Sequence, residues 1–166
     1  YPHGGVVDDL LVYMRGEGDY LLCINAGNIA KDIAWMQGKA RGYHCTVTDR
    51  SPDYGQLAIQ GPNAAALVQI MTKANLAEIK YYHFADGEVA GVKCLISRTG
   101  YTGEDGVELY CAAADSVRLA EAVVFVERDK LCVSVIEKNL ARAAWSAKAR
   151  VLRASALGPL SWIPFR

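Results

Sequence analysis

The sequence has no net charge and very little histidine. Lys and Arg together number 18, as do Asp and Glu. This balance argues against a surface dedicated to nucleic acid or to anionic membranes. Charged residues interrupt every long apolar stretch, so we expect no transmembrane helix. The histidines are His3, His44 and His83. None stands at metal-ligand spacing from another, so the sequence predicts no metal site.

Paired cysteine motifs are also missing. The chain has five cysteines, an odd number, and no two of them form a CxxC pair. A disulfide framework or a zinc knuckle is therefore not expected. We interpret the cysteines as free, mostly buried thiols of a protein from a reducing compartment.

The 166 residues, 52% of them hydrophobic, are enough for one globular domain with its own core. The amino-acid composition changes after about residue 128, since residues 142–153 are basic and rich in alanine. We therefore assign residues 1–128 to a domain and residues 129–166 to a divergent tail. Because the first residue is Tyr1 rather than Met, we interpret the sequence as an internal piece of a longer chain.

Short strand-like runs alternate with a few helical segments. The predicted strands span residues 6–14, 20–24, 44–47, 56–60, 81–84, 88–92, 93–98 and 107–111. Helices are predicted after Asn28 and Pro62, which suit helix starts, and over residues 114–127. Asp86-Gly87 is a hairpin-turn signal. The frequent hairpins favour an α+β fold, a mainly antiparallel sheet with helices packed on one face.

Asp8 and Asp9 stand next to each other among large apolar residues. In a strand they would point to opposite faces, so one could face a pocket. An ionised carboxylate is costly in apolar surroundings unless it is paired or hydrogen-bonded. A general base or an orienting carboxylate is one interpretation, and a solvated pair near a strand end is the other.

Residues 98–108, RTGYTGEDGVE, are rich in glycine but match no phosphate-binding fingerprint. A tight hairpin here would present Tyr101 as a flat aromatic wall and Glu108 as a hydrogen-bond acceptor. Such a pair suits a conjugated, nitrogen-rich heterocycle, although an ordinary glycine-rich turn is the alternative. Asn25 follows a predicted strand, where either a ligand contact or a turn is expected. Nucleophilic triads find no support.

Four sequence blocks, in this order, resemble the aminomethyltransferase, or T-protein, family of the glycine cleavage system. They are residues 4–10 (GGVVDDL), 25–32 (NAGNIAKD), 57–62 (LAIQGP) and 97–108 (SRTGYTGEDGVE). The resemblance covers about three quarters of the chain. It implies an incomplete folate-binding domain of the aminomethyltransferase type over residues 1–128.

The resemblance also implies a reaction and a set of site residues. Members receive an aminomethyl group on the lipoyl arm of the H-protein and transfer its methylene to tetrahydrofolate, releasing ammonia. Asp9 matches the catalytic aspartate of the family. Tyr101 and Glu108 match pterin-binding positions, and Asn25 matches a further folate contact. Arg150 is the best match to a substrate-binding arginine.

Alternatives to a complete enzyme stay open at this point. The chain could be a folate-binding module without catalysis, or an inactive fragment. A related folate-dependent demethylating dehydrogenase could be the parent. The family implies a location in the bacterial cytoplasm or, in a eukaryote, the mitochondrial matrix.

Overall fold

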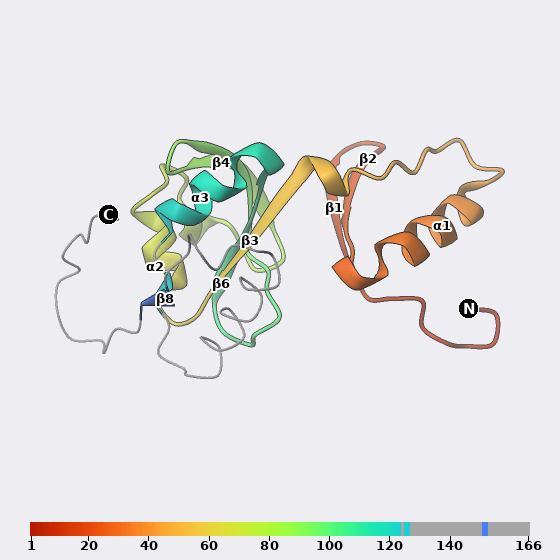
Figure 1. Cartoon of the computed structure of the whole chain (residues 1–166), viewed down its shortest axis with the longest axis horizontal. Coiled ribbons are helices and arrows are strands. Elements are labelled where there is room, and N and C mark those ends of the chain that lie inside the picture. The colour runs from red at the N-terminus through yellow and green to blue at the C-terminus, as the bar shows by residue number, and fades with distance from the viewer. Residues whose placement is uncertain (124, 127–150, 153–166) are drawn as a thin grey trace. The chain divides into compact units, whose positions relative to one another are not determined.

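The computed structural model describes residues 1–123, 125–126 and 151–152. The chain divides into two compact units, Tyr1–Pro52 and Asp53–Arg166. Each unit has its own helices and strands (Figure 1). Arg150 lies outside the described residues.

The first unit consists of a β-hairpin followed by one helix. Strand β1 (Leu11–Gly16) pairs antiparallel with β2 (Asp19–Cys23), in a register that sets Leu11 opposite Cys23. A short 3-10 helix, η1 (Ala26–Asn28), leads directly into α1 (Ile29–Ala40).

Two of the strand predictions for this unit are wrong, one in its starting residue and the other entirely. The strand predicted over residues 6–14 begins only at Leu11, because the short β2 offers no partner to the residues before it. Asp8 and Asp9 therefore precede the strand instead of lying in it. The strand predicted over residues 44–47 is irregular chain, with no paired strand among the described residues.

The second unit is built on a four-stranded antiparallel sheet with the order β3-β6-β5-β4. Its strands are β3 (Tyr54–Gln60), β4 (Phe84–Val89), β5 (Val92–Ser97) and β6 (Gly106–Ala112). This unit also contains α2 (Ala64–Gln69), α3 (Ser116–Ala122), the 3-10 helices η3 (Leu76–Glu78) and η4 (Ala113–Asp115), and the short parallel pair β7 (Phe125–Val126) and β8 (Val151–Leu152). The 3-10 helix η2 (Ser51–Asp53) spans the chain boundary between the two units.

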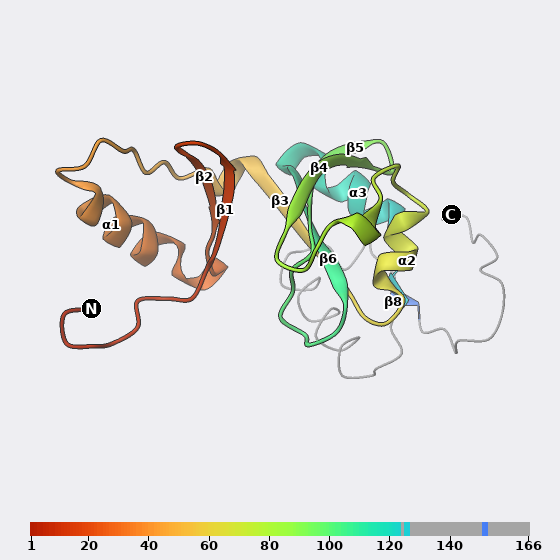
Figure 2. The ribbon, with the colours of Figure 1, turned by 180° about the vertical axis from the view of Figure 1, so that it is seen from behind.

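One face of this sheet forms the hydrophobic core. Leu57 and Ile96 lie opposite Leu109 on the two neighbouring strands, so all three side chains point to the same side of the sheet. Val68 of α2 and Leu119 of α3 pack against them and are fully buried. Figure 2 lets the reader follow these strands and helices from behind. The predicted fold class, an antiparallel sheet with helices packed on one face, is confirmed.

The hairpin turn predicted at Asp86-Gly87 is wrong, since both residues lie within β4. The turn falls at Ala90-Gly91, between the paired residues Val89 and Val92. Both turn residues have positive φ, 50° and 78°. That is the geometry of the two-residue turns that follow the twist of a hairpin.

The predicted helices of the second unit are shorter than their sequence pattern indicated. The segment after Pro62 is helical only over Ala64–Gln69, so Ile70 lies beyond the helix and is 75% exposed. The helix predicted over residues 114–127 spans Ser116–Ala122. Within the described residues, no helix has the length and apolar character needed to cross a membrane.

Candidate functional site

The hairpin of the first unit brings Asp8, Asp9 and Asn25 together. Asp9 lies just before β1 and Asn25 just after β2, so the antiparallel pairing places both at one end of the hairpin. The Asn25 side-chain amide donates to the Asp9 carboxylate, with Nδ2 3.2 Å from Oδ1. It also donates to the Asp9 carbonyl oxygen at 3.1 Å and to Asp8 Oδ1 at 2.9 Å. Two predicted site residues are thus in direct contact.

The Asp8 carboxylate accepts further hydrogen bonds within this cluster. The amide of Asn28 donates to Asp8 Oδ2 at 3.0 Å, and the backbone N–H of Asp9 donates to Oδ1 at 3.0 Å. Hydrogen bonding from the Asp32 carboxyl, followed by the amides of Asn28 and Asn25, holds the pKa of Asp8 far below its usual range. Asp8 is therefore an ionised carboxylate throughout the physiological range.

Asp32, in the first turn of α1, is the buried acid of this unit, with 2% of its side chain exposed. Lys31 Nζ lies 3.2 Å from Asp32 Oδ1. Burial, and after it the neighbouring Asp8, raises the pKa of Asp32 above its ordinary value. The pKa values of the two acids are thus shifted in opposite directions.

Glu108 is the buried acid of the second unit, with 3% of its side chain exposed. The Gln56 amide donates to its Oε1 at 3.0 Å, and the Tyr110 hydroxyl donates to its Oε2 at 3.3 Å. The Thr99 hydroxyl also donates to Oε2, and itself lies 2.8 Å from the Ser97 hydroxyl. These polar residues line the sheet face that is turned away from the core.

Tyr101 lies on the loop between β5 and β6 and is 76% exposed. Arg98 forms an ion pair with Asp105 across the base of this loop. The Gln60 amide donates to the Thr99 carbonyl oxygen at 3.1 Å. These bonds hold both ends of the loop, while its aromatic residue stays open to solvent.

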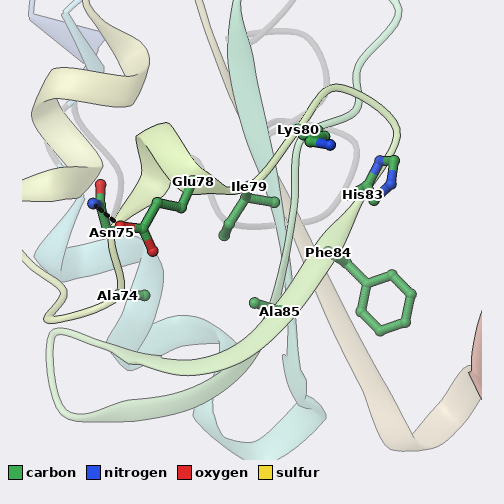
Figure 3. A pocket seen from close by; sticks show the side chains of 8 residues that line it. All are labelled: Ala74, Asn75, Glu78, Ile79, Lys80, His83, Phe84 and Ala85. Atoms are coloured by element: carbon green, nitrogen blue, oxygen red, sulfur yellow. Dashed lines mark hydrogen bonds between the residues drawn. The ribbon is translucent and has the colours of Figure 1, made fainter.

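A groove of about 460 Å³ opens elsewhere on the second unit, beside η3 and the start of β4 (Figure 3). Its lining comprises Ala74, Asn75, Glu78, Ile79, Lys80, His83, Phe84 and Ala85. Glu78 is engaged within it, because the Asn75 amide donates to its Oε1 at 2.8 Å. None of the predicted site residues that the structure describes lines this groove. Among the described residues, no three His, Cys, Asp or Glu side chains form a metal-binding group.

The sequence interpretation missed several partners of these acids. Asn28 was expected to cap α1, yet its side chain makes no capping bond and reaches Asp8 instead. Gln56 and Tyr110 were not singled out, although each lies on the same sheet face as Glu108. Their period-two spacing along paired strands was the available signal. Asp32 had no such signal, because an acid in a first helical turn is usually exposed.

Comparison with known proteins matches this chain to one family over most of its length. The model of the GCVT N-terminal domain matches residues 1–130. The aminomethyltransferase of Moorella thermoacetica is 59% identical over 114 residues, 69% of this chain and 31% of that protein. That of Geobacillus kaustophilus is 53% identical over 125 residues, 75% of this chain and 34% of that protein.

A solved structure shares the fold at low sequence identity. It is the heterotetrameric sarcosine oxidase from Corynebacterium sp. U-96 in complex with pyrrole 2-carboxylate, at 21% identity and a TM-score of 0.56. The match covers 89% of this chain and 66% of that one. The chain spans about a third of the length of the aminomethyltransferases that it matches. It belongs to the GCVT N-terminal domain family.

Proposed function

We propose that this chain is the folate-binding part of a tetrahydrofolate-dependent aminomethyltransferase of the glycine cleavage system. In that reaction the methylene of the lipoyl-bound aminomethyl group passes to tetrahydrofolate, ammonia leaves, and the lipoyl arm keeps a thiol. The observation that carries the proposal is the buried, ionisable Glu108 with its three side-chain donors. Residues 1–128 would form the partial folate-binding domain, and residues 129–166 the divergent tail.

Glu108 has the chemistry to bind the ring of a pterin. A carboxylate offers about four acceptor positions, and donors from Gln56, Thr99 and Tyr110 occupy three of them. The remaining position can accept an N–H of the heterocycle. Because Gln56, Thr99 and Tyr110 fix the carboxylate, little side-chain entropy is lost on binding. Tyr101 would supply the aromatic face against which the ring stacks.

Asp9 would handle the proton of the reaction. As a folate nitrogen forms its bond to the methylene carbon, it loses a proton, and a carboxylate within reach can accept it. Asn25 donates to the Asp9 carboxylate and so restricts its orientation. We include Arg150 as a further contact to the substrate on the strength of its family match alone.

The lipoylated H-protein would be the protein partner, and folate the small-molecule one. We expect neither nucleic acid nor membrane as a partner. The relatives named above are bacterial, which favours the cytoplasm, and the mitochondrial matrix would be the equivalent location in a eukaryote.

Calorimetric titration with tetrahydrofolate tests the binding half of the proposal. We expect saturable binding that weakens by about tenfold or more in Glu108→Ala, since a bond to a charged acceptor is lost. Glu104→Ala is the matched control, because Glu104 is an exposed acid on the neighbouring loop. The proposal fails if the cooperatively folded chain does not bind, or if both variants bind alike.

Turnover with aminomethylated H-protein tests the catalytic half. We expect Asp9→Asn to lower the rate by about a hundredfold or more while tetrahydrofolate still binds. Full activity of Asp9→Asn would refute the role of this residue.

A second candidate function is a folate-binding module without catalysis. The short length of the chain favours this candidate, since the chain spans about a third of the length of its aminomethyltransferase relatives. Saturable binding without turnover would support it over the enzyme. The absence of both would indicate an inactive fragment. Preference for an N-methylated amine as methylene donor would point to a demethylating dehydrogenase as the parent.

A further inference from the structure

Two asparagines at the start of α1 give their side chains to Asp8 instead of to the helix. Asn25 precedes η1 and Asn28 precedes α1, the positions where asparagine usually caps backbone N–H groups. Neither makes a side-chain capping bond. Their amides instead reach back 17 and 20 residues along the chain, to the same carboxylate. A local preference given up in this way marks a functional or strained position.

The two amides occupy different oxygens of Asp8. Asn25 donates to Oδ1 at 2.9 Å and Asn28 donates to Oδ2 at 3.0 Å. Bonds to an ionised acceptor are stronger than bonds between neutral groups. With both oxygens engaged, Asp8 is poorly placed to take up a substrate proton itself. Its carboxylate instead fixes the orientation of the Asn25 and Asn28 side chains.

Asn25 connects Asp8 to Asp9, the candidate catalytic residue. Its Nδ2 lies 2.9 Å from Asp8 Oδ1 and 3.2 Å from Asp9 Oδ1. A primary amide is planar with two hydrogens, so the bond to Asp8 determines how the amide is turned toward Asp9. Without Asp8, the Asn25 side chain would regain rotameric freedom.

We propose that Asp8 is a positioning residue, which holds the Asn25 amide in the orientation that fixes the carboxylate of Asp9. This inference rests on the proposed function, in which Asp9 is the reacting acid. Asp32 supports the arrangement as the buried neighbour of Asp8 on the first turn of α1. Lys31, whose ammonium donates to the Val7 carbonyl oxygen, ties α1 to the segment that carries Asp8.

The first experiment follows the side-chain amide protons of Asn25 by NMR in the full chain. We expect their hydrogen exchange to be about tenfold or more faster in Asp8→Ala and Asp8→Asn than in the parent chain. Asp8→Asn keeps the shape of the side chain but must lose an acceptor oxygen, which guards against a simple folding defect. Asp19→Ala is the control, since Asp19 is an exposed acid of this unit whose carboxylate is paired with Arg15. Unchanged exchange in both Asp8 variants would overturn the proposal.

The second experiment is a double-mutant cycle on turnover. Asp8→Ala and Asn25→Ala should each lower kcat, and the double variant should fall no further than the worse single variant, because both act through one amide. Multiplicative losses would overturn the proposal, since Asp8 would then act independently of Asn25. If Asp9→Asn keeps full turnover, the role proposed for Asp9 fails, while the exchange rates of Asn25 still decide whether Asp8 positions it.

Discussion

At the scale of single residues, neighbours in the sequence have very different surroundings. Asp8 accepts three hydrogen bonds through its carboxylate, from two amides and one backbone N–H. Asp9, the next residue, receives one long bond from the Asn25 amide on its carboxylate. Asp9 is thus the acid whose carboxylate keeps more free acceptor positions, in agreement with the role proposed for it.

Asp32→Asn should change how stability depends on pH. Burial and Asp8 raise the pKa of Asp32, so the folded chain keeps its proton above about pH 4, where the unfolded chain loses it. The free energy of unfolding of the parent chain therefore falls as pH rises through that window. An Asn at position 32 cannot ionise and can still donate to Asp8. We expect its stability advantage to grow from about pH 4 upward.

Urea denaturation of both chains at several pH values would measure this difference. Asp19→Asn serves as the matched control, because Asp19 is an exposed acid in the same unit. Parallel stability profiles for the parent chain and Asp32→Asn would contradict the expectation.

Alkylation should distinguish the cysteines by burial. Burial, then the neighbouring Cys111, raises the pKa of Cys94 to about 12, and burial also raises the pKa of Cys111. The thiolate is the reactive form, so both should resist iodoacetamide near pH 8 in the folded chain. The exposed Cys45 should react first. Peptide mass spectrometry before and after adding denaturant would give the order, and early labelling of Cys94 would refute it.

At the scale of the elements, close strand packing depends on small residues. A Cβ atom at Gly106, the first residue of β6, would lie 2.4 Å from the Ile59 carbonyl oxygen of β3. That oxygen belongs to the paired backbone, so it cannot move without opening the ladder. Glycine is thus required here by space, since a larger residue would separate β3 from β6.

Gly106→Ala should therefore destabilise the second unit, by about 1–3 kcal/mol as for other overpacked sites. Gly38→Ala is the matched substitution, because a Cβ there meets nothing within 4 Å and the residue lies within α1. It should stabilise its helix by about 0.5–1 kcal/mol. Native-state hydrogen exchange of β6 and α1 amides would report each unit separately. Equal effects of the same sign would count against this explanation.

At the scale of the whole molecule, the charge balance governs behaviour in solution. The formal net charge is zero at pH 7, and the isoelectric point is near 7.0. Repulsion between copies is therefore weakest at neutral pH. Large apolar side chains are also exposed on both units, including Val6 and Ile70. At neutral pH, weak repulsion between copies and exposed apolar side chains therefore both favour self-association.

Solubility should accordingly pass through a minimum near pH 7. Precipitation by polyethylene glycol at about pH 5.5, 7 and 8.5 would show this, with the least precipitant needed at the middle value. Added salt at about 0.15 M should reduce the contrast by screening. A solubility that changes steadily across this range would exclude net charge as its cause.

Much of the fold could be predicted because β3 and β6 keep a strand-like sequence pattern. Residues 107–111 and 56–60 were correctly predicted as strands, within two residues at each end. Strand predictions failed where the segment had no neighbouring strand to pair with. Residues 6–10 and 44–47 have strand-forming residues but no strand pairs with them among the described residues.

The candidate site was predictable to a similar degree. Asp9 and Asn25 were both singled out, and the structure shows them in contact. Tyr101 and Glu108 belong to one sequence block but lie in opposite surroundings, one exposed and one buried. The roles of these four residues, with that of Arg150, stay predictions.

The sequence alone determined the family, because the motif blocks and their order are properties of the chain. The pattern of short strands and hairpins in the sequence also predicted the antiparallel α+β class. Only the tertiary structure decided that Asn28 holds Asp8 and that Asp32 is buried beside it. Hydrogen bonds between residues some twenty positions apart arise from the closure of the hairpin onto the start of α1. No local pattern encodes such a closure, since it depends on where both chain segments come to lie in space.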